Sequence, residues 1–196
     1  MIGYVIATIV VVVILGSFLS IYLFRKYREE GKDENDPYDF MIHGMRFYVR
    51  VDANKKEVER TSRIIVDGME HALSVVFRND PEYGAKCYSV YVRDKVWSKI
   101  KYIEFLDRIP DPLSKSGECT GEYGKDRIKV ALIDKCICRT ALAHELMHAI
   151  GDYLLDSTDS SHSLGEYWEG VYTKDEVDFP GVVNIATKYC LEKVEG

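Results

Sequence analysis

The first 24 residues of this 196-residue chain contain no Asp, Glu, Lys or Arg. The formal net charge of -6 therefore lies entirely in the remainder, and so acidic a domain argues against nucleic-acid binding, which needs basic surface. No Asn-x-Ser/Thr glycosylation site occurs. The five cysteines are an odd number, which argues against a complete disulfide framework. No internal repeat or low-complexity tract is present, which argues against a repeat architecture.

An uninterrupted apolar run of 23 residues extends from Ile2 to Phe24. As a helix it would be about 35 Å long, enough to cross a hydrocarbon core of about 30 Å. The start lacks the basic residues of a signal peptide, and the run ends in bulky side chains instead of a small-residue cleavage site. We therefore predict one uncleaved transmembrane helix over residues 1–24.

Three basic residues, Arg25, Lys26 and Arg28, follow the apolar run, and nothing basic precedes it except the amino terminus. Positively charged flanks stay on the cytoplasmic side of a membrane. The pattern therefore predicts a single-pass membrane protein whose C-terminal domain lies in the cytoplasm. Residues 25–39 are charged and have no apolar period, which is typical of a juxtamembrane linker.

The folded domain is expected to occupy residues 40–196. Alternating apolar residues predict a strand over Met45–Val51, and helical spacing predicts a long amphipathic helix over Lys55–Phe77. Further strands are predicted at Tyr88–Val92 and Arg127–Ile133, with a loop around residues 109–124, and further helices at Thr140–Leu155 and Pro180–Val194. This order of elements predicts an α+β domain whose sheet carries helices on one side.

Residues 141–151 read Ala-Leu-Ala-His-Glu-Leu-Met-His-Ala-Ile-Gly. On a helix, His144 and His148 lie one turn apart, so both imidazoles can reach a single ion. Glu145 is rotated by about 100° from His144, close enough to take a proton from a water molecule at the metal without binding the metal itself. Water is a poor nucleophile towards an amide, and zinc overcomes this by lowering the pKa of water to about 7.

The motif and its position after the strand predicted at Arg127–Ile133 resemble the zincin metallopeptidases. The resemblance covers residues 45–195, and its specific part is the stretch 127–170. It implies one catalytic domain in which a mixed sheet lies over the active-site helix, with one zinc ion per chain. It also implies that an edge strand of the sheet pairs with the substrate backbone, and Arg127–Ile133 is the candidate for that edge.

A catalytic zinc site needs a third protein ligand. The metzincin pattern would place it at Leu154, which cannot bind metal, and no methionine follows His148, so the chain departs from a standard metzincin. We prefer His162, whose setting is similar to SprT-like proteins, where a His followed shortly by an aromatic pair opens the next helix. The alternative is Glu169, in a setting similar to the gluzincins. Glu166 and Asp152 are further candidates.

The sequence therefore predicts a membrane-anchored zinc endopeptidase acting on a protein or peptide substrate. His144, His148 and His162 are the predicted zinc ligands, and Glu145 is the predicted general base. The alternative is a membrane-anchored, non-catalytic domain of the same fold that binds zinc or a protein. The intact Glu145 argues against this alternative, because a non-catalytic metal site has no need of a carboxylate there. No nucleic-acid partner is expected, because neither a second zinc module nor a basic surface is present.

Overall fold

The computed structural model describes residues 37–111, 117–132, 137–155, 170–172 and 177–196. The chain divides into two units, residues 1–37 and 38–196, and all elements below belong to the second unit. Among the described residues, no helix combines the length and the apolar character needed to span a membrane. The transmembrane helix predicted over residues 1–24 lies outside the described residues.

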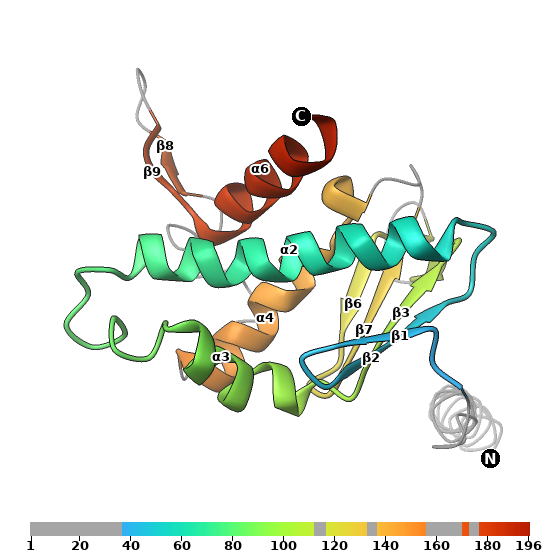
Figure 1. Cartoon of the computed structure of the whole chain (residues 1–196), viewed down its shortest axis with the longest axis horizontal. Helices are drawn as coiled ribbons and strands as arrows, with labels where there is room; N and C mark the ends of the chain where they lie inside the picture. Colours follow the sequence, from blue (N-terminus) through green and yellow to red (C-terminus); the bar gives the residue numbers. More distant parts are fainter. Residues whose placement is uncertain (1–36, 112–116, 133–136, 156–169, 173–176) are drawn as a thin grey trace, which may run out of the picture. The chain divides into compact units, whose positions relative to one another are not determined.

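Five strands form a mixed sheet in the order β1-β2-β3-β7-β6 (Figure 1). They are β1 (Phe40–Ile42), β2 (Met45–Val49), β3 (Tyr102–Leu106), β7 (Arg127–Ala131) and β6 (Gly121–Tyr123). The β1–β2 and β6–β7 pairs are antiparallel, whereas β2–β3 and β3–β7 are parallel. The predicted α+β class is therefore confirmed, with a mixed sheet.

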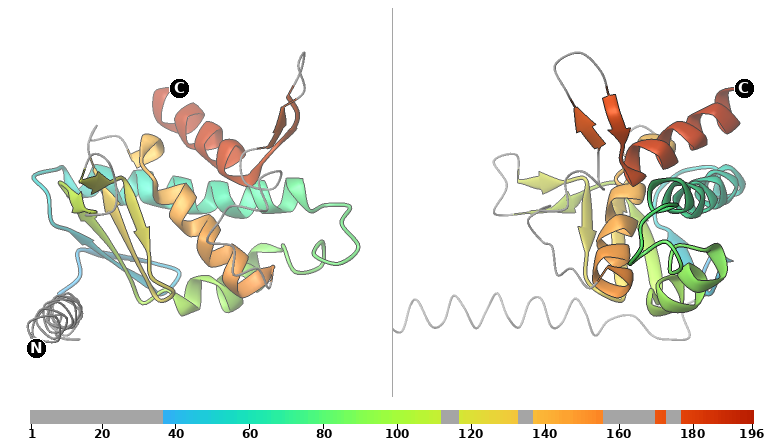
Figure 2. Two further views of the ribbon diagram at one scale, coloured as in Figure 1. Left: turned by 180° about the vertical axis from the view of Figure 1, so that it is seen from behind. Right: turned by 90° about the vertical axis from the view of Figure 1, so that its left-hand side faces the viewer.

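The described helices are α2 (Lys55–Val76), α3 (Ser89–Lys95), α4 (Leu142–Leu154) and α6 (Val182–Glu195). The remaining described elements are β4 (Ile109–Pro110) paired with β5 (Glu118–Cys119), β8 (Gly170–Tyr172) paired with β9 (Val177–Pro180), and the 3-10 turns η1 (Trp97–Lys99) and η2 (Ile137–Arg139). Helix α4 is central, because it packs against α2, α3 and α6 and also against β6 and β7 (Figures 1 and 2).

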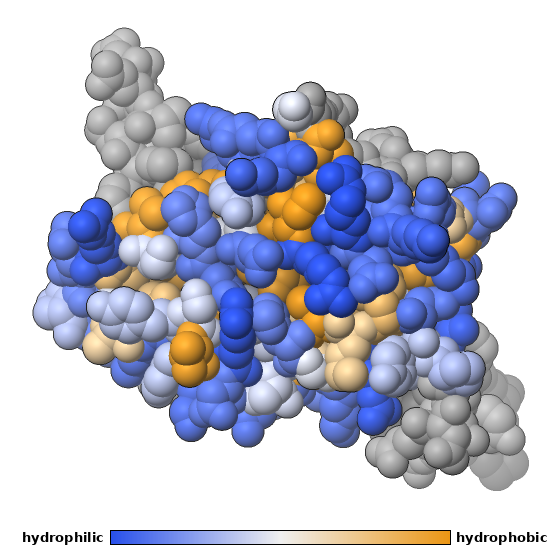
Figure 3. Space-filling model, viewed as in Figure 1, coloured by the Kyte–Doolittle hydropathy of each residue, from blue (hydrophilic) through white to orange (hydrophobic). Residues whose placement is uncertain are grey.

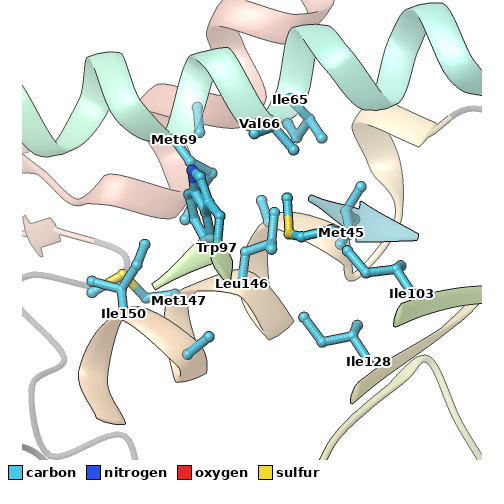
Figure 4. Packing of buried hydrophobic residues seen from close by; sticks show 14 of the residues in the cluster. Met45, Ile65, Val66, Met69, Trp97, Ile103, Ile128, Leu146, Met147 and Ile150 are labelled. Atoms are coloured by element: carbon cyan, nitrogen blue, oxygen red, sulfur yellow. The ribbon is translucent and has the colours of Figure 1, made fainter. Parts of the chain in front are cut away.

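One face of the sheet supplies the hydrophobic core. Phe47, Ile103 and Ile128 are neighbours across β2, β3 and β7, and all three are fully buried. Figure 4 shows Ile103 and Ile128 of the sheet together with Met69 of α2 and Leu146 of α4, all members of this core. Because side chains alternate along a strand, the opposite face carries the intervening residues. These are Arg46, Tyr48, Tyr102, Glu104, Arg127 and Lys129.

The long helix predicted over Lys55–Phe77 is confirmed as α2. The side chain of Asn54 caps its start by accepting hydrogen bonds from the backbone N–H groups of Lys56 and Glu57. The apolar residues that predicted the helix are all buried, namely Val58, Ile65, Met69, Leu73 and Val76. The face of the domain seen in Figure 3 is largely hydrophilic, as expected for the outer side of an amphipathic helix.

Two of the predicted elements were wrong. Tyr88–Val92 is not a strand, because helix α3 begins at Ser89. The β-branched and aromatic residues favoured a strand locally, but packing of α3 on α2 and α4 buries Val92 completely and overrides that propensity. The loop predicted around residues 109–124 contains strands β4, β5 and β6.

The edge strand was also wrongly predicted. Arg127–Ala131 forms β7, which pairs with β3 on one side and with β6 on the other, so it is an internal strand. Gly121–Tyr123, which forms β6, ends the strand order instead. Within the described part of the chain, no strand pairs with the outer side of β6.

A disulfide joins Cys138 of η2 to Cys190 of α6, with the Cα atoms 5.6 Å apart. The bond closes a loop across a sequence separation of 52 residues, which in the chain-entropy account stabilises a fold by about 4 kcal/mol. Cys87 and Cys119 are free thiols. The odd cysteine count allowed a bridge but gave no indication of which pair would form it.

Candidate metal centre

Helix α4 carries the predicted motif, and the helix prediction over Thr140–Leu155 is confirmed. Its start is fixed by Thr140, whose hydroxyl donates to the Ile137 carbonyl oxygen at 2.7 Å and accepts from the Leu142 N–H at 3.3 Å. Four apolar residues one turn apart are buried in the core, namely Leu142, Leu146, Ile150 and Leu154. His144 and His148 lie on a different side of the helix and are half-buried.

The structure brings His144 and His148 together, as the spacing predicts. Their ring centroids are 5.1 Å apart, and the two ring planes are inclined by 76°. Both side chains line a cavity of about 750 Å³. Two imidazoles one helical turn apart, open to a cavity, are a donor set that suits zinc.

Glu145 lies in the wall of the same cavity and is only 6% exposed. Burial, with a smaller contribution from the negative charge of Glu122, raises the pKa of its carboxyl to about 8. Gly121 of β6 lies directly against the Glu145 side chain, so a β-carbon at position 121 would overlap the carboxylate. Any larger residue at position 121 would force the Glu145 side chain to move.

Strand β6 and the turn after it form the wall of the cavity opposite α4. This wall consists of residues 121–125, and the α4 wall consists of His144, Glu145, His148, Asp152 and Tyr153. Three carboxylates and one lysine line the cavity, which is therefore acidic. Glu122 is the most exposed of these carboxylates, and it forms an ion pair with Lys129 at 2.9 Å. This wall was not predicted, because residues 109–124 were expected to form a loop.

Tyr123 contacts α4 through both its ring and its hydroxyl. Its ring stacks on the His148 imidazole, with the centroids 5.7 Å apart and the planes 10° from parallel. Its hydroxyl donates to Asp152 Oδ2 at 3.0 Å. Burial, followed by the Asp152 carboxylate, raises the pKa of Tyr123 well above its usual range, so the hydroxyl keeps its proton.

His162, Glu166 and Glu169, the predicted third ligand and two of its alternatives, lie outside the described residues. Asp152 is described, but it lies eight residues after His144 on one helix, about 12 Å further along the axis. Within the described ranges, no third His, Cys, Asp or Glu completes a metal-binding group with His144 and His148. Such a group would need three ligand atoms that all lie within 4.8 Å of one another.

A second cluster, His43, Asp67 and Glu70, was not predicted. Its ligand atoms lie within 4.8 Å of one another, so the group could hold a metal ion. His43 Nε2 lies 3.7 Å from Glu70 Oε1 and 4.0 Å from Asp67 Oδ1. Burial, followed by the charge of Arg93, lowers the pKa of His43 and favours the neutral imidazole that metals bind.

The surroundings of Glu70 oppose a metal at this second cluster. Arg93 donates to both Glu70 carboxylate oxygens at 2.8 Å, and the Trp97 indole donates to Oε1 at 3.0 Å. A metal ion would compete with these donors and would lie close to the Arg93 charge. This cluster is hard to predict from sequence, because Asp67 and Glu70 lie one turn apart on α2 but His43 comes from the turn between β1 and β2.

No protein-family model, curated protein or solved structure matches this chain.

Proposed function

We propose that the domain is a zinc-dependent endopeptidase in which His144 and His148 bind the metal and Glu145 is the general base. The observation that carries the proposal is the position of Glu145, a buried carboxylate that lines the same cavity as two imidazoles one helical turn apart. His162 remains the proposed third ligand, and Glu169 the alternative. When bound, zinc would supply a Lewis acid that polarises the scissile carbonyl and makes water acidic enough to attack it.

Glu145 would perform the proton transfers. A carboxyl with a pKa near 8 is mostly protonated at neutral pH, but a divalent cation nearby favours the ionised form. The carboxylate can then accept a proton from the attacking water and donate it to the leaving amine. Gly121 supports this role because it leaves space for the Glu145 side chain beside β6.

The proposed substrate is a peptide in extended conformation. The outer side of β6 has no strand partner in the described part of the chain, and β6 forms one wall of the cavity. An extended peptide could add to this edge through main-chain hydrogen bonds, which would carry its backbone past Glu145. This proposal replaces the earlier assignment of the substrate edge to Arg127–Ile133.

The proposal is tested by replacing Glu145 with Gln in the full-length protein. The variant should retain its zinc, because Glu145 is not a ligand, and should lose peptidase activity on fluorescently labelled casein by about 100-fold or more. Glu122→Gln is the matched control, since Glu122 lines the same cavity but is exposed and paired with Lys129. Retention of most activity by Glu145→Gln would contradict the proposed role.

A non-catalytic membrane-anchored domain that binds zinc or a protein is the second candidate. The open edge of β6 favours it, because strand addition binds a peptide whether or not the peptide is cleaved. Stoichiometric zinc together with peptide binding, and no cleavage of any protein substrate by the wild type, would support this candidate against the peptidase.

We further propose that the chain is a single-pass membrane protein with its domain on the cytoplasmic side. Arg25, Lys26 and Arg28 support this orientation. The Cys138–Cys190 disulfide is evidence in the other direction, since disulfides persist mainly in oxidising compartments. A topology measurement separates the two.

A further inference from the structure

Strand β6 presents two neighbouring residues of one face to α4. Gly121 and Tyr123 are two positions apart, so their side-chain directions are the same, whereas Glu122 points to the other face. Gly121 lies against Glu145, and Tyr123 lies against His148. The strand therefore contacts the proposed base with its smallest residue and one proposed metal ligand with an aromatic ring.

We propose that Tyr123 is a positioning residue that fixes the orientation of the His148 imidazole for metal binding. This inference rests on the proposed function, because it assumes that His148 is a ligand. An imidazole binds a metal through a nitrogen lone pair in the plane of its ring. The Tyr123 ring lies nearly parallel to the imidazole, with the planes 10° apart and the centroids offset at 5.7 Å, so it restricts ring rotation and leaves the edge of the imidazole available.

Tyr123 is itself held from two directions, which is what a positioning role requires. On the sheet side, β6 pairs with β7, and Tyr123 is the register partner of the buried Ile128. On the helix side, its hydroxyl donates to Asp152, one turn after His148 on the same helix. The Tyr123 ring is therefore held in place relative to α4. Because His148 is itself on α4, the ring and the imidazole keep a fixed position relative to each other.

Removal of the Tyr123 ring should weaken metal binding, even though Tyr123 is not a proposed ligand. His148 would regain rotational freedom, and metal binding would have to restrict it again. Disturbing a residue that orients a metal ligand weakens binding by about 10- to 100-fold. We therefore expect Tyr123→Leu to weaken zinc binding within this range, whereas Tyr123→Phe, which keeps the stacked ring, should weaken it less.

The experiment measures the zinc dissociation constant of the full-length protein in detergent by competition with a chelator of known affinity. A second readout is the visible absorption spectrum of the cobalt-substituted protein, which reports ligand geometry and which a purely structural role would not change. Tyr102→Leu is the control, because it removes the same ring from β3, where Tyr102 packs on Tyr48 outside the cavity. This control should leave both readouts as in the wild type.

Zinc affinity and a cobalt spectrum like those of the wild type in Tyr123→Leu would overturn the inference and leave the proposed function intact. Absence of zinc binding in the wild type would instead overturn the proposed function. If Tyr123→Leu does not fold, as judged by circular dichroism, Asp152→Ala provides the test. It keeps the ring but removes its hydrogen-bond partner, so an altered cobalt spectrum supports the inference and an unaltered one overturns it.

Discussion

Replacement of Glu145 by Gln should stabilise the metal-free protein at alkaline pH and have little effect on its stability under acidic conditions. Burial, with a smaller contribution from the Glu122 charge, raises the pKa of Glu145 from its usual 4.5 to about 8. Because the folded state holds this proton more tightly than the unfolded state, the free energy of unfolding falls as pH rises from 4.5 to 8. Glutamine has nearly the same shape and no charge, so it avoids this loss.

The size of the effect follows from the width of that pH interval. Within this interval the free energy of unfolding of the wild type falls by about 1.4 kcal/mol for each pH unit. The total loss is therefore at most about 5 kcal/mol by pH 8. Water entry and relaxation around a buried charge reduce this limit, and we expect Glu145→Gln to be the more stable protein by about 1–3 kcal/mol at pH 8.5.

Urea unfolding of both full-length proteins in excess chelator, followed by tryptophan fluorescence, measures this difference at pH 5, 7 and 8.5. Trp97 is fully buried in the core and should report the transition. Glu122→Gln is the control: it keeps the buried Glu145, so its free energy of unfolding should fall with pH nearly as in the wild type, and slightly less because the Glu122 charge contributes to the raised pKa of Glu145. A difference between wild type and Glu145→Gln that does not change with pH would refute the reasoning, since it would mean that Glu145 titrates normally.

Three further predictions concern the site and the membrane. Gly121→Ala should destabilise the protein by about 1–3 kcal/mol in urea unfolding, because its β-carbon would overlap the Glu145 carboxylate, and an unchanged unfolding midpoint would contradict that contact. His162→Ala should weaken zinc binding strongly in chelator competition and Glu169→Ala only slightly, whereas the opposite ranking would indicate a gluzincin-like site. A reporter fused after Lys26 should behave as cytoplasmic; protease protection that shows the domain outside would contradict this and would agree with the disulfide.

The parts of the fold that the sequence predicted are those determined by local periodicity. Helix α2 spans 22 residues with a regular apolar stripe, and its spacing could be read directly. His144 and His148 come together through helix geometry alone, so no knowledge of the rest of the fold was needed. Helix α4 was similarly clear because its apolar residues recur every four positions.

The parts that the sequence did not predict depend on contacts between distant segments. Strand β6 has only three residues, which is too short for an alternating pattern to stand out, yet it forms the sheet edge and one wall of the cavity. Tyr123 and His148 lie 25 positions apart and meet only because β6 pairs with β7 over α4. The contact between His43 and Glu70 similarly depends on the packing of the β1–β2 turn against α2.

The most direct test of the central claim is the zinc content of the purified full-length protein by elemental analysis. We expect close to one zinc per chain in the wild type and almost none in His144→Ala or His148→Ala. His43→Ala is the control for the second cluster and should retain its zinc. Stoichiometric zinc in both His144→Ala and His148→Ala would contradict the account, and loss of zinc in His43→Ala alone would place the metal at the second cluster.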